Sequence, residues 1–247
     1  MLKRFGLIAV AFAALGLLGG CITDQHLSAA SDLYTAATIS NGELVQLSKE
    51  MREAGDKENK VAPKNNKYAT RLARLTKRFL KEDGLDLNFK VYITNEVNAN
   101  ATADGSIRVY SGLMDMMTDN ELVFVIGHEI GHVKDGDSLD KVRMAYASSG
   151  ALKAAAASSK TAATALNSAQ LGDLLNTVLN AQFSQKQESD ADAYGYGLMK
   201  KYKLDVKAAV SALEKLGGGS ASITSSHPGS ADRAKAIQKM IDADAKK

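Results

Sequence analysis

The residues with the clearest capacity for chemistry lie in segment 128–132, HEIGH, which fits the pattern H-E-x-x-H. On a helix, residues four positions apart share one face about a turn apart. Two imidazoles at the spacing of His128 and His132 can bind one Zn²⁺, and Glu129 then lies to one side of the pair, where it can hold a metal-bound water. Zinc lowers the pKa of that water toward about 7, so a carboxylate can take its proton. The predicted chemistry is attack of water on a polarised carbonyl.

A five-residue pattern also arises by chance from two surface histidines, and the flanking sequence argues against that alternative. The apolar stretch Leu122–Gly127 precedes the motif, and Ile130 and Val133 continue it. Such a helix is apolar nearly all round and is therefore expected to be buried. Buried histidine and glutamate side chains are costly without partners, and a metal ion supplies them. We therefore expect one Zn²⁺ per chain.

A catalytic zinc has three protein ligands and a fourth, open position. The metzincin pattern needs glycine and histidine where this chain has Asp135 and Ser138, so that class is excluded. Glu188 and Asp192 are four residues apart and share a helix face, so Glu188 can ligate zinc while Asp192 orients a zinc-binding histidine through its other nitrogen. The alternative for this pair is a solvated acidic surface, which is the reading we adopt for Asp190.

Hydrophobic periodicity and capping signals predict the helices that must position these residues. Thr118 and Glu121 form a capping box, which predicts a helix from Asp119 to about Lys134. Further helices are predicted at about 29–53, 63–84, 182–202, 206–216 and 231–244, with Ser230 capping the last. The remaining segments are predicted as a polar linker at 54–62, a short turn at 112–117 and a solvated helical insert, rich in Ala and Ser, at 145–170.

Three short segments have the composition of β-strands: 89–93, about 97–102, and 107–110. Asp104-Gly105 between the last two is a tight-turn signal. Asn98–Ala101 and Ile107–Tyr110 are the two candidates for a free sheet edge beside the zinc, where an extended peptide can pair with main-chain groups. For each strand the alternative is an ordinary internal position in the sheet.

The N-terminus has the features of a secretory signal. Lys3 and Arg4 precede an apolar run, Phe5–Leu18, that is shorter than the roughly 20 residues a spanning helix needs. The alternative is an anchor that stays attached. Leu18-Gly19-Gly20 precedes Cys21, the single cysteine, and resembles the bacterial lipobox, in which the cysteine is diacylated. Ile22 rather than Asp follows, and in Gram-negative lipoproteins this implies the outer membrane.

These signals divide the chain into three parts: a lipoprotein signal peptide at 1–20, a lipidated tether and N-terminal helix at 21–60, and a zinc metallopeptidase domain at 61–247. The formal net charge of +3 falls to +1 when Lys3 and Arg4 are removed with the signal. A nearly neutral chain without tryptophan and with 6% aromatic residues gives no basis for nucleic-acid binding.

The combination of H-E-x-x-H on an apolar helix with a distant Glu188-x-x-Ala191-Asp192 resembles the HtpX and CAAX-prenyl-endopeptidase type of zinc metallopeptidases. Segment 107–121 (IRVYSGLMDMMTDNE), Asn98-Ala99 and segment 182–185 (QFSQ) are similar to the subgroup of outer-membrane lipoproteins typified by LoiP. The resemblance implies an α+β fold of the compact gluzincin type, mainly helical, with a small antiparallel or mixed sheet beside the active-site helix.

The resemblance also implies roles for individual residues. It makes His128, His132 and Glu188 the zinc ligands, Glu129 the general base, and Asp192 a second motif carboxylate that is sometimes described as a proton donor. His227-Pro228 followed by Arg233 resembles a recurring element of the family. The His227 imidazole can donate to the tetrahedral oxyanion, or occupy the fourth zinc position and keep the enzyme latent, or have no role. Tyr194 and Tyr196 are weaker oxyanion candidates, for which we favour the helix core.

The leading hypothesis is a membrane-anchored zinc metalloendopeptidase that cleaves misfolded or membrane proteins of the cell envelope, a role implied by the resemblance. Its expected location is the outer membrane, facing the periplasm, with lipidated Cys21 in the bilayer and envelope proteins as partners. Two other hypotheses remain open. One is a zinc-stabilised, chaperone-like binding module, and the other is a latent protease with His227 on the metal.

Overall fold

The computed structural model describes residues 39–149, 166–218 and 221–246. The predicted signal peptide, Cys21 and most of the Ala/Ser-rich insert lie outside these residues. The helices are α2 (Asn41–Glu58), α3 (Lys67–Thr76), the 3₁₀ turn η1 (Glu82–Gly84), α4 (Ser111–Met116), α5 (Asp119–Lys134), α6 (Asp137–Ser148), α9 (Ser168–Asn180), α10 (Gln185–Lys201), α11 (Lys207–Gly217), α12 (Ala221–Ser226) and α13 (Ser230–Asp244).

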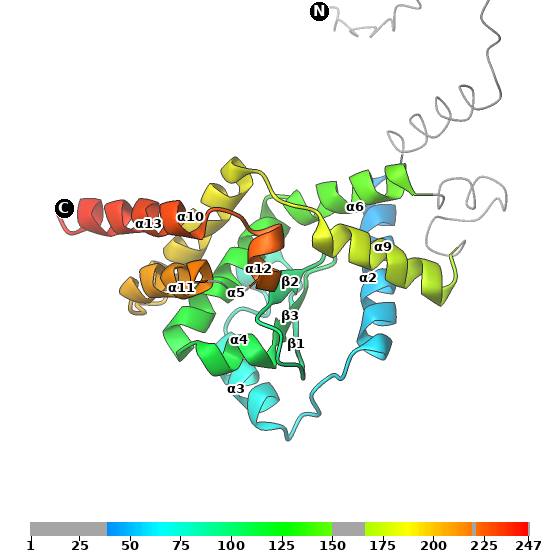
Figure 1. Cartoon of the computed structure of the whole chain (residues 1–247), viewed down its shortest axis with the longest axis horizontal. Coiled ribbons are helices and arrows are strands. Elements are labelled where there is room, and N and C mark those ends of the chain that lie inside the picture. The colour runs from blue at the N-terminus through cyan, green and yellow to red at the C-terminus, as the bar shows by residue number, and fades with distance from the viewer. Residues whose placement is uncertain (1–38, 150–165, 219–220, 247) are drawn as a thin grey trace, which may run out of the picture.

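A three-stranded mixed sheet lies at the centre of these helices (Figure 1). Its strands are β1 (Asn88–Tyr92), β2 (Ala99–Ala101) and β3 (Ser106–Tyr110). They are arranged in the order β1-β3-β2, with β1 parallel and β2 antiparallel to β3. The mainly helical α+β class is therefore confirmed. Of the two candidate edge segments, Asn98–Ala101 contributes β2, which lies at an edge of the sheet. Ile107–Tyr110 takes the alternative, internal position, because β3 is paired on both sides.

The turn between β2 and β3 forms at the predicted Asp104-Gly105. Asp104 accepts hydrogen bonds from the hydroxyls of Thr102 and Ser106, both at 2.7 Å. Gly105 has a φ of +82°, and a Cβ there would lie 2.2 Å from the carbonyl oxygen of Asp86. Glycine is required at this position for both reasons.

The two faces of the sheet have opposite character because successive side chains alternate. The apolar face packs on α3 and α5 and forms the main core, which includes Val91, Ile107 and Val109. The other face is polar and is covered by α2. There Asp56 accepts hydrogen bonds from Lys90, Tyr92 and Arg108, and Arg52 donates to Asn100 Oδ1 at 2.6 Å.

Helix α2 also belongs to a second apolar cluster that it forms with α6 and α9, on one side of the sheet in Figure 1. Leu47, Met51, Tyr146 and Leu174 are buried there. The predicted linker at 54–62 is partly wrong, because α2 continues to Glu58 and buries Ala54 in this cluster. Apolar residues of the distant α9 stabilise those last turns, and no local signal in 54–58 reports that contact.

Two other local predictions need correction. The expected turn at 112–117 lies in the helix α4, whose Leu113 and Met114 are buried. Ser230 is the first residue of α13 rather than its cap, since Gly229 with a φ of +83° takes the N-cap position. Helix α6 was not predicted before residue 145, where the expected helical insert begins. Among the described residues, no helix has the length and apolar character to cross a membrane.

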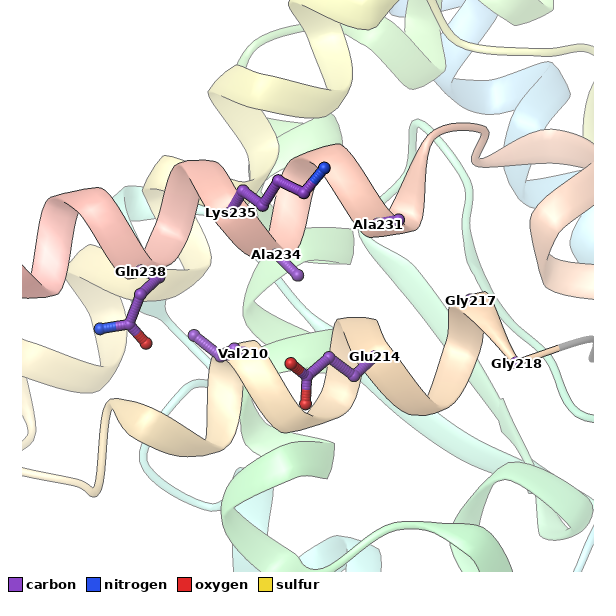
Figure 2. A pocket seen from close by; sticks show the side chains of 8 residues that line it. All are labelled: Val210, Glu214, Gly217, Gly218, Ala231, Ala234, Lys235 and Gln238. Carbon is purple, nitrogen blue, oxygen red and sulfur yellow. The ribbon is translucent and has the colours of Figure 1, made fainter.

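A surface hollow lies between α11 and α13, and Figure 2 shows the residues that line it. Small residues, Gly217, Ala231 and Ala234, lie where the two helices approach, and the polar side chains of Glu214 and Gln238 extend beside them. No candidate site residue lines this hollow, and the chemistry lies elsewhere.

Candidate metal centre

Helix α5 carries the H-E-x-x-H motif and spans the predicted range. Thr118 accepts a hydrogen bond from the Glu121 amide, and the Glu121 carboxylate accepts one from the Thr118 amide, which completes the capping box. Every residue from Glu121 to His132 is buried, as the apolar sequence predicts. His128 and His132, one turn apart, and Glu129 therefore project from a rigid, solvent-shielded element.

Helix α10 reaches α5 through residues that lack bulky side chains. A Cβ on Gly127 would lie 2.9 Å from the Cα of Gly195, and one on Gly131 would lie 3.0 Å from the Cα of Ala191. The two backbones therefore approach more closely than larger side chains allow. This approach brings Glu188, which is 1% exposed, and Asp192 from α10 to the histidines of α5.

Four side chains converge at this junction: His128, His132, Glu188 and His227, the last from the loop between α12 and α13. Their ligand atoms all lie within 4.8 Å of one another. Nε2 of His128 is 3.0 Å from Nε2 of His132, and Glu188 Oε1 is 3.4 Å from the latter. Nδ1 of His227 lies 3.2 Å from His128 Nε2 and 2.8 Å from Glu188 Oε1. The structure thus brings together residues that are up to 99 positions apart.

Carboxylates hold the other nitrogen of both α5 histidines. His128 Nδ1 lies 2.9 Å from Asp192 Oδ1, and His132 Nδ1 lies 2.8 Å from Asp137 Oδ2. Since an ionised carboxylate only accepts, each Nδ1 carries the hydrogen and each Nε2 presents a lone pair. Two lone pairs directed at one another at 3.0 Å repel unless a cation lies between them.

This donor set suits a bound metal ion. A tetrahedral site with bonds of about 2.0 Å has ligand atoms about 3.3 Å apart, close to the separations found here. Glu129 is 2% exposed, and its Oε1 has no hydrogen-bond partner among the described residues. A buried carboxylate oxygen without a partner is costly, and it lies beside the four ligand atoms, 3.6 Å from His227 Nε2. The residues therefore fit a metal with a polar group or water next to Glu129.

The electrostatics of the group favour metal binding near neutral pH. Burial lowers the pKa of His128 and lowers that of His227 to about 4, so both rings are neutral, the form that binds metals. At Glu188, burial is outweighed by the neighbouring imidazoles of His132 and His227, and the pKa of its carboxyl is lowered. Burial is also outweighed at His132, where Asp137 and Glu188 raise the pKa. A metal at this site therefore competes with a proton at His132.

Arg233 on α13 links the two carboxylates of α10. Its Nε and Nη2 donate to Asp192 at 2.7 Å each, and its Nη1 contacts Glu188 Oε2. Because burial is outweighed by the Arg233 and His128 hydrogen bonds, the pKa of Asp192 is lowered, and it is ionised. The Arg233 guanidinium therefore holds both Glu188, which lies beside the histidines, and Asp192, which orients His128.

All the predicted site residues of α5, α10 and the His227 loop lie together, and Asp190 is exposed as expected, paired with Lys186. The two tyrosines point elsewhere. Tyr194 donates to Asp83 and Tyr196 to Asp244. The sequence reasoning missed Asp137, which also accepts a hydrogen bond from Gln187 at 2.9 Å. Its signal was an acidic residue shortly after the motif, in the part of α6 that was not predicted.

Comparisons with known proteins agree with this geometry. The chain matches Peptidase family M48 over residues 66–241. It is 39% identical to Metalloprotease YcaL of Escherichia coli K12 over 245 residues, which is 95% of this chain and 96% of that protein. It is 37% identical to Metalloprotease LoiP of the same organism over 96% of this chain and 97% of LoiP. A Protease HtpX homolog of Sulfurovum is 34% identical over 83 residues, covering 31% of this chain and 30% of that protein.

Proposed function

This chain belongs to peptidase family M48 and is a metalloprotease, and from that premise we propose that it is a zinc endopeptidase in which Glu129 takes a proton from the attacking water. The observation that carries the proposal is the position of Glu129. Its Oε1 is buried, accepts no hydrogen bond from the part of the chain that the structure describes, and lies 3.6 Å from Nε2 of His227, which belongs to the same group as His128, His132 and Glu188. A structural metal site has no need of a free carboxylate at that place.

His128, His132 and Glu188 would hold the metal. Two imidazoles and one carboxylate form a donor set that zinc prefers in hydrolases and that leaves a fourth position open. When bound there, zinc supplies a Lewis acid that polarises a carbonyl and lets water act as a nucleophile at neutral pH. Asp192 and Asp137 fix the protonation of the two imidazoles, so that Nε2 of each stays available as a ligand.

The remaining steps belong to side chains of this protein. Glu129 Oε1 accepts the proton of water and can pass it to the amine of the cleaved peptide, since this buried oxygen has no hydrogen-bond partner among the described residues. Asp192 is bound by both His128 and Arg233, which argues for an orienting role rather than proton donation. The main-chain groups of Ala99 and Ala101 in β2 face away from β3, and we propose that an extended substrate pairs with this edge.

The test of the proposal is metal content measured together with hydrolysis. The wild-type protein should bind one Zn²⁺ per chain and should cleave casein, and a chelator should abolish the cleavage. Glu188→Ala should lower both the bound zinc and the rate. An exposed change on the same helix, Ser189→Ala, is the matched control and should alter neither. Full zinc binding and hydrolysis by Glu188→Ala would contradict the proposed ligand set.

A second candidate, a latent form of the same protease, is favoured by the position of His227. Its Nδ1 lies 3.2 Å from His128 Nε2 and its Nε2 lies 3.6 Å from Glu129 Oε1, so the ring lies next to both a candidate ligand and the proposed general base. We propose that His227 is a fourth ligand that must leave before catalysis. His227→Ala should then raise the rate of casein cleavage, whereas an oxyanion donor would lower it when removed. An unchanged rate would show that His227 has neither role.

We also propose that the protein is a lipoprotein of the bacterial outer membrane that faces the periplasm and acts on misfolded or membrane proteins of the envelope. Support comes from the basic start, the short apolar run and Leu18-Gly19-Gly20-Cys21. Labelling of cells with radioactive palmitate should mark the wild-type chain but not Cys21→Ala. The wild-type chain should be recovered in the outer-membrane fraction, whereas Cys21→Ala should not. Equal labelling or equal membrane association of both forms would contradict this proposal.

A further inference from the structure

Phe183 lies at a point where several parts of the metal centre meet. It immediately precedes Ser184, whose side chain caps α10, the helix that carries Glu188. Its amide donates a hydrogen bond to the carbonyl oxygen of Ser226, the residue before His227. The backbone at Phe183 therefore joins the start of α10 to the loop that holds His227.

The ring of Phe183 stacks on His132. The two ring centroids are 3.6 Å apart and the planes differ by 6°, so the contact is face to face. The same ring lies 5.0 Å from the His227 ring at an angle of 41°. Phe183 is buried, with 8% of its surface exposed, and no other phenylalanine among the described residues makes a ring contact with the four-residue group.

Lys141 on α6 covers the opposite face of the ring. Its Nζ lies 3.1 Å from the Phe183 centroid. At that distance the nitrogen cannot lie in the plane of the ring, because the ring's own hydrogens occupy that space. His132 fills one face, so the ammonium group lies over the other. Lys141 is 9% exposed, and burial lowers its pKa to about 8, which leaves it mostly protonated at neutral pH. A cation over a ring face is attracted by the π electrons and holds the ring in place.

These contacts restrict a rotation of the His132 ring that its hydrogen bond to Asp137 leaves free. The bond from Nδ1 to Asp137 fixes the direction of that nitrogen, but the ring can still tilt about the bond axis. A flat ring stacked at 3.6 Å blocks the tilt, because any rotation out of plane drives His132 atoms into Phe183. The two contacts together set the line along which Nε2 points toward His128 and Glu188.

We propose that Phe183 is a positioning residue of the metal centre, which holds the His132 ring in its ligand orientation by face-to-face stacking. The inference rests on the proposed function, in which His132 is a zinc ligand. It predicts that position 183 requires a flat aromatic ring and that apolar volume alone is not sufficient. A side chain that only fills the space should keep the fold but loosen the metal.

The test compares Phe183→Leu, which keeps apolar bulk, with Phe183→Tyr, which keeps the ring. Purified protein is titrated with Zn²⁺ against a chelator of known affinity, and the visible absorption of the Co²⁺-substituted protein reports ligand geometry. Loss of groups that orient a metal ligand typically weakens binding by about 10–100-fold. Phe183→Leu should therefore raise the Kd for Zn²⁺ at least about tenfold and change the Co²⁺ spectrum, whereas Phe183→Tyr should stay within about threefold of wild type.

Phe79→Leu is the matched control, because Phe79 is also a buried phenylalanine and its ring contacts Tyr202 rather than a histidine. It should lower the free energy of unfolding but leave the Kd for Zn²⁺ unchanged. Equal Zn²⁺ affinity of wild type and Phe183→Leu, or an equal loss in Phe79→Leu, would overturn the inference. If Phe183→Leu does not fold, Phe183→Met carries the same prediction. A wild-type protein that binds no Zn²⁺ would instead refute the proposed function itself.

Discussion

Arg233 and Asp192 form a bidentate ion pair beside the metal centre, with Nε and Nη2 each 2.7 Å from a carboxylate oxygen. Both side chains are buried, at 9% and 3% exposed. One of those oxygens, Oδ1, is also 2.9 Å from Nδ1 of His128. A charge on α13 therefore acts through α10 on a candidate ligand of α5, and three helices share one electrostatic unit.

Asp192→Asn should weaken metal binding without unfolding the protein. The amide keeps the shape of the side chain but lacks the charge that orients His128 and makes it a better ligand, so we expect the Kd for Zn²⁺ to rise about 10–100-fold. Chelator competition measures this. Asp190→Asn is the matched control, since Asp190 lies on the same helix, is exposed and pairs with Lys186. An equal effect of both substitutions would contradict the orienting role.

Arg233→Met should destabilise the metal-free protein more than the zinc-loaded one. Removal of the cation leaves Asp192 and Glu188 as buried, uncompensated charges, which typically costs about 3–5 kcal/mol. A bound divalent cation near Glu188 offsets part of that cost. Urea unfolding with and without Zn²⁺ should show a larger zinc-induced stabilisation in the variant than in wild type. The same increment in both proteins would show that Arg233 does not act on the metal centre.

Gly195→Ala should separate α5 from α10. The added Cβ would lie 3.0 Å from the Phe124 carbonyl oxygen and 3.1 Å from the His128 amide nitrogen, both backbone atoms that cannot move alone. Overpacking of this kind costs about 1–3 kcal/mol. Gly197→Ala on the same helix meets nothing within 4 Å and should instead stabilise by about 0.5–1 kcal/mol. Thermal unfolding distinguishes the two, and equal behaviour would contradict the close packing described for α5 and α10.

Acid should weaken the cap of α5 through Glu121. Although burial opposes it, hydrogen bonds from Lys215, Ser211 and Thr118 lower the pKa of Glu121 to about 2, from an ordinary value of 4.5. The folded state thus favours the ionised form, and the stabilisation is complete above about pH 4.5 and is lost as the pH falls toward about 2. It amounts to at most about 3.5 kcal/mol, at about 1.4 kcal/mol per pKa unit.

Glu121→Gln keeps the capping geometry but removes this charge. It should lower the free energy of unfolding at pH 7 and flatten its pH dependence between about pH 4.5 and 2. Glu43→Gln is the matched control, because Glu43 completes the capping box of α2 but is exposed. The control should have a smaller effect at pH 7. A pH profile of Glu121→Gln that parallels wild type would rule out the contribution of the buried ion pair.

Local signals account for the parts of the fold that were predicted well. Thr118 and Glu121 fix the start of α5 within four residues of chain, and Asp104-Gly105 fixes a turn within two. The order of the strands depends instead on pairing between distant segments. Whether Ile107–Tyr110 is an edge or a centre is decided by β1, which lies before β2 in the chain. The hydrophobic periodicity of one segment does not indicate which other strands will pair with it.

Local spacing also accounts for the part of the candidate site that was predicted from the sequence. His128, Glu129 and His132 are grouped by helical spacing, and Glu188 and Asp192 repeat that spacing on α10. The residues around them come from other elements. Asp137 lies on α6, Phe183 precedes α10, and the ion pairs of Arg233 depend on how α13 packs. No spacing rule joins these side chains to the motif, so only the packed structure reveals them.

The most direct test of the account is Glu129→Gln, which replaces one carboxylate oxygen by an NH₂ group in a side chain whose Oε1 has no hydrogen-bond partner among the described residues. Zinc content and Kd should stay at the wild-type values, and the cleavage rate of casein should fall by about 10²–10⁴-fold, the contribution typical of a general base. A variant that still cleaves casein at the wild-type rate would contradict the mechanism. Retained cellular function without cleavage would instead favour the zinc-stabilised binding module.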